Sequence, residues 1–474
     1  MRHIAVRIAV YAAKLLPVVV VILWAGCPAL AQKQTPPPGG PPKPFTVPAQ
    51  ESYSLPNGTR VTLVPYGKLP KVTVSLVVRA GDFNQPADQV GIADLTGRLL
   101  KEGTASRSAQ ALAEEAAQMG GAMDVGVGDD ESAISIDVLS EFGPGAVQLI
   151  ADVAQHPLLP ESEFPRLKND ALREVAIARS QPQPIALERF RKILYGDHPY
   201  SRTLPTAEEL QKLTAEDARK FYQANFGAAR AHLYVAGSFD VVAVKKAIAA
   251  SFSAWPKGPV PLVDVPQLGA KRVLDVTDRP GASQSTLYVG LPVPSPASPD
   301  NIPLGVMNTL LGGYFSSRIT ANIREQKGYT YSPRSQVSRR FQDAYWVEIA
   351  DVTTAVTGPA LKEILGEVER LRKEPPSAAE LQGVQGYISG LFVIQNSSRG
   401  ALIGQLRYVD LQRLGGDYLK TYVQKVNAVT PAEVQRMAGQ YLDPAKMAIV
   451  IVGDKVKISE QLAPFASEEK PADH

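Results

Sequence analysis

The residues that first raise a question of chemistry are Asp94 and Arg98, four positions apart, with Gly97 between them. The apolar positions around them recur at helical spacing and are Ile92, Leu95 and Leu99. Side chains four apart lie on one face of a helix, so two histidines there can reach one metal ion. An aspartate followed by an arginine instead favours an ion pair, because arginine keeps its proton and cannot ligate zinc.

The segment from Gly91 to Thr104 resembles the H-x-x-E-H zinc helix of the inverzincin peptidases. In that motif the histidines hold the ion and the glutamate takes a proton from the metal-bound water. Here Asp94 and Arg98 stand at the histidine positions, and Gly97 stands at the glutamate position. The sequence therefore predicts a helix of this type with a degenerate metal site.

A third ligand of such a site would be a glutamate on a later helix, and Glu174 lies in a segment of the appropriate form. We expect Arg98 to replace the charge of the ion and to pair with Asp94 and Glu174, because a buried acidic pair without a cation is costly. The alternative is that Glu174 is an ordinary exposed helix charge. We expect no metal and no cofactor in this chain, because no two of its histidines have ligand spacing.

Residues 1–31 have the pattern of a secretory signal peptide. Three basic residues precede an apolar run, and Ala29-Leu30-Ala31 forms a small-x-small cleavage site. The pattern predicts a periplasmic or secreted protein cleaved after Ala31, without a membrane span, since the run is short for a transmembrane helix. The alternatives are an uncleaved anchor and a lipoprotein modified at Cys27, the one cysteine of the sequence.

The net charge of +3 belongs to this leader, which holds three basic residues and no acidic ones. The remaining chain has 47 lysines and arginines against 47 aspartates and glutamates. Such a balance argues against a nucleic acid or an anionic membrane as partner.

Proline-rich stretches indicate the domain organisation. Residues 32–49 read as an extended tether, and a second break begins at Trp255. The predicted parts are a signal peptide (1–31), the tether (32–49), an N-terminal domain with the degenerate zinc helix (50–254), a linker (255–272), a C-terminal domain (273–457) and a tail (458–474).

The two halves show signs of duplication. Thr214 and Thr430 each open a predicted helix, and the strands that follow run into Gly237 and Gly453. Both pairs of residues are separated by 216 positions. This constant spacing indicates a repeated domain, although the matched stretch is short.

Each half mixes helix and strand. Alternating residues predict strands over 59–64 and 71–78 that form a hairpin, with Asn57-Gly58 as the turn before the first strand. Ser108 is a suitable cap for a helix that runs to Met119. Two further stripes indicate a strand face and a helix face, and they are Ile134, Ile136 and Val138, and Leu361, Ile364, Leu365, Val368 and Leu371.

The segment from Leu310 to Ser332 carries a more specific signal. It reads Leu-Leu-Gly-Gly-Tyr-Phe-Ser-Ser-Arg and then, from Ile323, Ile-Arg-Glu-Gln-Lys-Gly-Tyr-Thr-Tyr-Ser. Together with the degenerate zinc helix, this segment resembles the pitrilysin/insulinase family of zinc peptidases. The small bacterial form, similar to the subunits of the mitochondrial processing peptidase, matches over nearly all of residues 50–455.

The resemblance implies an α+β fold of two homologous α/β-sandwich domains, of the LuxS/processing-peptidase metallopeptidase type, that form half of a clamshell. Each domain would hold a mixed, mostly antiparallel sheet covered by helices. In the family an arginine and a tyrosine of the second domain reach the substrate at the zinc, and they map onto Arg324 and Tyr331. Donors of these types stabilise the oxyanion formed during peptide hydrolysis. Read without the family, they are a surface arginine and a half-buried strand tyrosine.

The resemblance also implies that residues 121–131 hold the edge strand to which a peptide substrate adds a strand. The acidic residues of this segment would favour basic substrates, or would form a solvated turn. They are Asp124, Asp129, Asp130 and Glu131.

Some relatives act as pairs, in which one chain holds the intact zinc motif and the other holds the arginine and tyrosine. This sequence resembles the second kind. The expected function is a non-catalytic subunit, with zinc and the H-x-x-E-H motif in a homologous partner and an unfolded peptide as substrate. The alternatives are a proteolytically inert scaffold or peptide-binding protein and, disfavoured by the residues present, a self-sufficient peptidase with an unusual site.

Overall fold

The computed structural model describes residues 46–266, 268–269 and 271–466. The chain forms two units, Met1–Lys43 and Pro44–His474, and the second is described below. The predicted signal peptide and most of the predicted tether lie outside the described residues. Within the described ranges, no helix is both long enough and apolar enough to cross a membrane.

The first sheet has six strands in the order β1-β2-β6-β3-β5-β4. The pairing of β2 with β6 is parallel, and the other neighbours are antiparallel. The strands are β1 (Glu51–Ser54), β2 (Arg60–Pro65), β3 (Lys71–Val78), β4 (Met123–Val127), β5 (Ser132–Leu139) and β6 (Ala231–Gly237).

The second sheet has five strands in the order β7-β11-β8-β10-β9, again with one parallel pairing, between β7 and β11. Its order and directions repeat β2-β6-β3-β5-β4 of the first sheet, which confirms the predicted fold of two homologous domains with mixed, mostly antiparallel sheets. The strands are β7 (Val273–Asp278), β8 (Gln284–Val293), β9 (Arg334–Arg340), β10 (Asp343–Thr353) and β11 (Ala448–Gly453).

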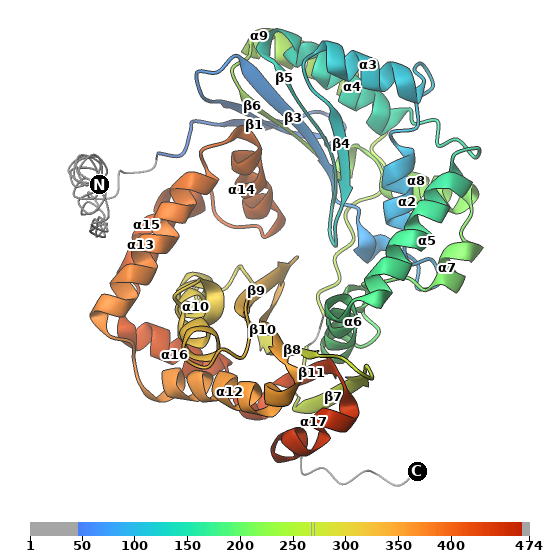
Figure 1. The fold of residues 1–474 in the computed structure, drawn as a ribbon. Coiled ribbons are helices and arrows are strands. Elements are labelled where there is room, and N and C mark those ends of the chain that lie inside the picture. The colour runs from blue at the N-terminus through green and yellow to red at the C-terminus, as the bar shows by residue number, and fades with distance from the viewer. Residues whose placement is uncertain (1–45, 267, 270, 467–474) are drawn as a thin grey trace, which may run out of the picture. The chain divides into compact units, whose positions relative to one another are not determined.

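The helices also occur in corresponding order (Figure 1). The first half contains α2 (Ile92–Leu99), α3 (Ala109–Gln118), α4 (Gly143–Gln155), α5 (Phe164–Ser180), α6 (Pro182–Tyr195), α7 (Ala207–Lys212), α8 (Ala215–Asn225) and α9 (Val241–Phe252). The second contains α10 (Asn301–Asn308), α11 (Arg318–Thr320), α12 (Thr357–Lys373), α13 (Ala378–Gln395), α14 (Arg399–Leu411), α15 (Tyr418–Ala428), α16 (Pro431–Tyr441) and α17 (Lys455–Leu462). Two π-helical turns, η5 (Thr309–Gly313) and η6 (Ala321–Gln326), flank α11.

Local sequence signals account for several helix starts. The side chain of Thr214 accepts a hydrogen bond from the N–H of Asp217, whose carboxylate accepts from the Thr214 N–H. Thr430 and Glu433 make the same capping box at the start of α16. Ser108 caps α3 as predicted.

One face of each sheet is covered by helices from the same half of the sequence. The helices α2 and α4 contribute fully buried residues such as Ile92 and Val147 to one core, and α12 contributes Leu361 and Ile364 to the other. The predicted apolar stripes of β5 and α12 lie in these cores, apart from Leu365, which is partly buried.

The opposite face of each sheet is covered by a helix from the other half of the sequence. Helix α6, from the first half of the sequence, packs Ala186, Phe190 and Leu194 against the second sheet, near Tyr288 and Tyr345. Helix α14, from the second half, packs apolar residues against the first sheet, near Val64 and Tyr234. The residues from α14 are Leu402, Ile403 and Leu406. Both sheets are therefore buried on two faces.

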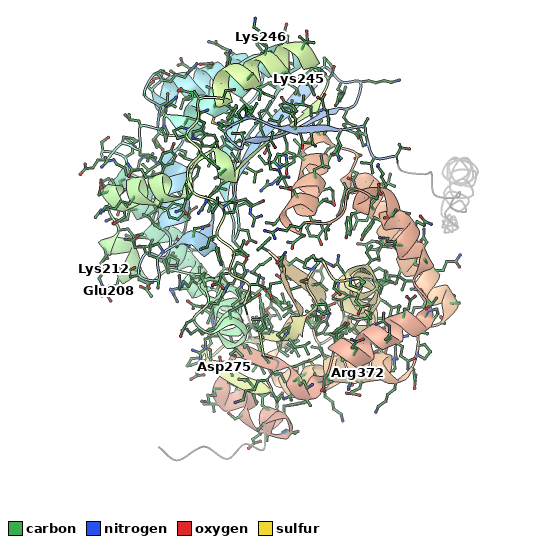
Figure 2. All side chains as sticks on the ribbon, turned by 180° about the vertical axis from the view of Figure 1, so that it is seen from behind. Glu208, Lys212, Lys245, Lys246, Asp275 and Arg372 are labelled. Carbon is green, nitrogen blue, oxygen red and sulfur yellow. The ribbon has the colours of Figure 1, made fainter. Side chains whose placement is uncertain are left out.

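Ion pairs reinforce this exchange. Arg189 of α6 donates to Asp275 of β7 through Nε at 2.7 Å and Nη2 at 3.0 Å (Figure 2 labels Asp275). Arg399 of α14 donates to Asp137 of β5, with Nη2 2.9 Å from Oδ1. Each arginine thus binds a strand of the sheet that its own helix covers.

The structure corrects two expectations. The predicted hairpin of residues 59–64 and 71–78 is wrong, because β6 lies between β2 and β3. Local alternation cannot reveal this strand, which begins only at Ala231. The Asn57-Gly58 turn does precede β2, as predicted, and joins it to β1. The predicted tail (458–474) also begins too early, because Ile458 and Leu462 of α17 belong to the second core.

A buried carboxylate lies beneath the Gly312-Gly313 turn. Glu348 of β10 is fully buried, and no side chain of the described residues donates a hydrogen bond to it, although the backbone and the charge of Arg334 offset part of the cost of its burial. A Cβ on Gly312 would lie 2.7 Å from its Oε2, which explains a glycine at that position. Burial raises the pKa of Glu348 well above its ordinary value.

We predict that Glu348→Gln makes the protein more stable than the wild type at pH 7.5. The folded pKa is raised, so between pH 4.5 and that pKa the native state holds a proton that the unfolded chain has lost. Stability falls as pH rises through this window, by about 1.4 kcal/mol per pH unit. Urea unfolding from pH 4.5 to 8 should show the variant's advantage growing with pH. A pH-independent difference, or one equal to that of the exposed control Glu141→Gln, would contradict this.

Candidate functional site: an arginine in a degenerate metal site

The structure brings Asp94, Arg98 and Glu174 together. Arg98 of α2 donates from Nε to Asp94 Oδ2 at 2.7 Å. Its Nη1 and Nη2 donate to the two carboxylate oxygens of Glu174 on α5, at 2.9 and 2.6 Å. The guanidinium thus donates one hydrogen bond to Asp94 and two parallel hydrogen bonds to Glu174. Only the planar, forked arginine side chain can make this arrangement.

The electrostatics agree with this geometry. Hydrogen bonds from Arg98 lower the pKa of the Glu174 carboxyl, and the bonds to Glu174 raise the pKa of Arg98. The side chain of Glu174 is nevertheless 59% exposed, so the cluster is a partly solvated ion pair and not a buried triad. Glu174 is therefore both an exposed helix charge and a partner of Arg98.

These residues do not fit a zinc ion. Zinc requires three or four unprotonated donors within bonding distance, and the guanidinium stands where a donor is needed. Across the part of the chain that the structure describes, no group of three or more His, Cys, Asp or Glu side chains is placed to hold a metal.

Gly97 has a steric role. It faces the edge strand β4, and a Cβ at this position would lie 2.6 Å from Cγ2 of Val127. A glutamate at the position of the general base therefore has no room while Val127 keeps its place. Because Gly97 has no side chain, β4 can approach α2 closely at this position.

Arg324 lies between two exposed aromatic rings. Its Cζ is 4.2 Å from the ring centroid of Phe315 and 5.0 Å from that of Tyr331. Phe315 is 64% exposed and Tyr331 78% exposed. Such cation–π contacts contribute about 0.5–1 kcal/mol each at exposed sites. Glu325 lies 3.3 Å from Nε, and the two Nη groups have no hydrogen-bond partner among the described residues, so these groups can donate to an oxyanion or a carbonyl.

The chain returns to Arg324 through a tight turn. Gly328 has φ +63 and its N–H donates to Arg324 O, which ends the helical turns. Thr330 then fixes the segment to β10, where its hydroxyl donates to Asp351 O at 2.7 Å. Tyr331 is not a half-buried strand residue, because it is largely exposed and β9 begins only at Arg334, after Pro333.

The acidic turn of residues 128–131 is neither free for basic substrates nor simply solvated. Asp129 pairs with Arg191 and with the buried Arg340, 3.2 and 3.0 Å away. Asp130 accepts from the hydroxyl of Tyr200 at 2.5 Å and from the N–H of Phe341 at 3.0 Å.

The other carboxylates of this segment differ from each other. Glu131 pairs with Arg407 at 3.3 Å. Asp124 alone of the four lies exposed on β4. Among the described residues β4 pairs with β5 alone, so it is an edge strand of the first sheet.

Sequence reasoning did not identify Phe315, which completes the aromatic pair around Arg324. Its position within the Gly-Gly…Ser-Ser-Arg segment was visible, but nothing in the pattern distinguishes an exposed phenylalanine from a buried one. Val127 was likewise missed as the residue that excludes a side chain at position 97, because the contact crosses from one element to another.

Comparison with protein families gives two matches. The model described as "Insulinase (Peptidase family M16)" matches residues 61–208, and "Peptidase M16 inactive domain" matches residues 212–386. A protein described as an uncharacterized zinc protease of Streptomyces coelicolor is 23% identical over 82% of this chain and 86% of its own. YmxG of Bacillus subtilis, with a similar description, is 23% identical over 82% of this chain and 94% of its own.

Solved structures share the fold. A peptidase M16 inactive domain from Pseudomonas fluorescens superposes with a TM-score of 0.79 at 24% identity, covering 85% of this chain and 98% of that one. A protease from Helicobacter pylori gives 0.80 at 20% identity, over 86% and 100%. The periplasmic protease PqqL of Escherichia coli gives 0.72 at 19% identity, over 89% of this chain and 49% of that one.

We predict that Arg98→Met lowers the free energy of unfolding at pH 7.5 by about 1–2 kcal/mol, since it leaves two carboxylates facing each other without a cation. The folded pKa of Glu174 is lowered, so its stabilisation is present above pH 4.5 and is lost as pH falls through the folded value. The deficit should therefore narrow at pH 3.5, as measured by urea unfolding.

The matched control is Lys212→Met on α7, which removes an exposed pair with Glu208 at 2.8 Å (Figure 2). Fully exposed pairs of this kind contribute little to stability, because water screens them. If Arg98→Met is no less stable than this control at pH 7.5, the cluster contributes no more to the free energy of unfolding than an exposed ion pair does.

We also predict that Gly97→Ala destabilises the protein by about 1–3 kcal/mol, as overpacking does. In an unconstrained helix the same change stabilises by about 1 kcal/mol. Because the new methyl group would meet Val127, the double variant Gly97→Ala/Val127→Ala should recover part of the loss. Thermal unfolding of the two single variants and the double variant gives the coupling, and simple additivity would refute the contact.

Proposed function

We propose that this chain, which belongs to peptidase family M16, the insulinase family, is a non-catalytic subunit of a two-chain zinc peptidase. The observation that carries this proposal is the hydrogen-bonded Arg98 between Asp94 and Glu174. A site closed by its own ion pair is expected to be stable without a metal. The hydrolytic metal would then belong to a homologous partner with an intact H-x-x-E-H helix.

In this proposal Arg324 and Tyr331 act on the substrate held by the partner. Attack on a peptide carbonyl places negative charge on its oxygen, and donors aimed at that oxygen lower the barrier. The aromatic contacts support the role of Arg324, because ring contacts position the cation without accepting hydrogen bonds from its terminal Nη groups. The phenol of Tyr331 is exposed and is a second available donor.

The edge strand β4 is the proposed binding site for the unfolded peptide. Its outer backbone groups have no strand neighbour among the described residues. An extended peptide gains affinity from main-chain hydrogen bonds at such an edge, largely without regard to its sequence. Since the acidic turn beyond β4 is engaged by arginines and tyrosines, we do not expect a strong preference for basic peptides.

We further propose that the chain is exported and cleaved after Ala31, as its leader indicates. A structural neighbour, PqqL, is described as a periplasmic protease, which is consistent with this location. N-terminal sequencing of the exported protein tests it, since a lipoprotein would begin at Cys27.

A second candidate is an inert scaffold or peptide-binding protein of the same fold. The contact of Arg324 with Glu325, 3.3 Å away, favours it, because a neighbouring carboxylate competes with an anionic transition state for the guanidinium. Binding of a neutral peptide strand by β4 would be unaffected by this pair.

Reconstitution with a partner distinguishes these candidates. The mature chain is expressed alone and together with a homologous chain that carries H-x-x-E-H, and cleavage of an unfolded peptide is measured. We expect activity only in the mixture, reduced about tenfold to a hundredfold by Arg324→Ala or Tyr331→Phe, with kcat affected more than KM. The matched control Arg334→Ala should leave the rate unchanged.

Metal analysis completes the test. The chain purified alone should hold no stoichiometric zinc, and the zinc of the complex should follow the partner. Co-purification without cleavage would favour the scaffold. Chelator-sensitive cleavage by the lone chain would overturn both candidates.

A further inference from the structure

A cavity of about 350 Å³ lies between the first sheet and α14, away from both groups described above. Strands β1, β2, β3 and β6 contribute to it, as does the linker through Pro261 and Val263. Its charged lining is unusually basic. Four arginines, Arg60, Arg79, Arg230 and Arg413, face two carboxylates, Glu131 and Asp410.

Both carboxylates are already paired. Asp410 of α14 accepts from Arg60 and lies 3.2 Å from Nδ1 of His232. Glu131 lies 3.3 Å from Nη2 of Arg407, which is outside the cavity lining, and 3.9 Å from Nε of Arg79. The acids therefore leave an excess of positive charge in the cavity.

His232 does not add to that charge near neutral pH. Burial lowers its pKa, so the imidazole is neutral. Its Nδ1 contacts the carboxylate of Asp410, and its Nε2 is 2.9 Å from the hydroxyl of Thr62. The pKa of Asp410 is also lowered. Thr62 in turn lies 2.9 Å from the hydroxyl of Ser52. This chain of hydrogen bonds forms a polar wall that positions Asp410 against Arg60.

Arg79 and Arg413 share one neutral neighbour. Their Cζ atoms lie 4.6 and 5.2 Å from the ring centroid of Phe341. Nε of Arg79 is buried and has no hydrogen-bond acceptor among the described residues, although a buried guanidinium N–H without an acceptor is costly. Arg413 is exposed at the cavity mouth, and no carboxylate of the described residues pairs with it within 4 Å.

Arg230 lies beside Arg79 and has only neutral acceptors. Its Nε donates to Val260 O at 3.1 Å, and its Nη1 donates to the amide oxygen of Asn225 at 2.9 Å. Burial, and then the charge of Arg79, lower its pKa. Two like charges in a partly buried position are stabilised most directly by an anion between them.

We propose that this cavity binds a small organic oxyanion, whose carboxylate or phosphate group lies among Arg79, Arg230 and Arg413. Arginine binds both groups through paired N–H donors. The apolar part of the lining would accommodate a short carbon body, and it includes Val77, Tyr234, Leu406 and Leu414. The site is independent of the proposed peptidase role, since none of its residues contacts Arg98 or Arg324.

Thermal unfolding of the mature chain tests this proposal. Inorganic phosphate and succinate are each titrated at constant ionic strength, with sodium chloride as the balance. A ligand that binds only the native state raises the Tm in a saturable way. We expect such a rise with at least one probe, and the probe that saturates at the lower concentration identifies the preferred head group.

Two variants locate the site. Arg79→Gln should abolish the saturable rise, and Arg413→Gln should increase the half-saturating concentration about tenfold, as expected for the loss of one charge-assisted hydrogen bond. The control Arg173→Gln, an exposed arginine on α5, should retain the wild-type response. Because Arg413 is exposed, its variant is expected to fold even where Arg79→Gln does not.

The proposal is overturned if neither probe raises the Tm above that in chloride at equal ionic strength. It is equally overturned if Arg413→Gln responds with the same half-saturation as the control. Cleavage assays are not used, so failure here leaves the proposed peptidase role untouched.

Discussion

The exchange of α6 and α14 between the two sheets is the constraint on which the rest of the structure depends. A sheet buried on one face leaves the other face exposed to water, and the inner strands here are apolar on both faces, as β6 shows with all seven of its residues buried. Each half therefore needs a helix from the other half to complete its burial. The two domains are homologous, yet neither sheet is fully covered by its own half of the sequence.

This exchange fixes how the hairpin turns of the two sheets meet. The turn after β4 and the turn after β9 lie in contact, where Asp130 accepts from the N–H of Phe341 and Asp129 pairs with Arg340. Arg340 is 2% exposed and lies within 6 Å of the rings of Tyr195, Tyr200 and Tyr345. An acidic segment that looks like a substrate-binding feature in the sequence is thus largely part of a structural contact. The outer edge of β4 has no strand neighbour among the described residues, and backbone groups at such an edge offer affinity without sequence selectivity.

Local signals predicted local structure well, and failed where distant segments meet. The capping residues Ser108, Thr214 and Thr430 and the stripe on α12 could be placed because each depends on neighbours within a few turns. The pairing of β2 with β6 could not be predicted, because parallel strands are joined by a long crossover and neither strand's own sequence identifies its partner. The same reason hid Phe315 beside Arg324 and Val127 beside Gly97. The ion pair of Arg98 was predictable only because the metal motif gave the spacing of three residues in advance.

The residues at the positions of the metal motif fit one another. Removing a zinc ion leaves carboxylates that repel each other, and the two oxygens of Glu174 receive the guanidinium of Arg98 in the ion's place. Gly97 has no side chain, and Val127 of β4 lies so close that a Cβ there would be 2.6 Å from its Cγ2. Each change makes the reverse change unfavourable, since a histidine at 98 uncovers the carboxylates and a glutamate at 97 collides with Val127. Metal binding at these positions would therefore require several substitutions at once, and none of them alone would stabilise the protein.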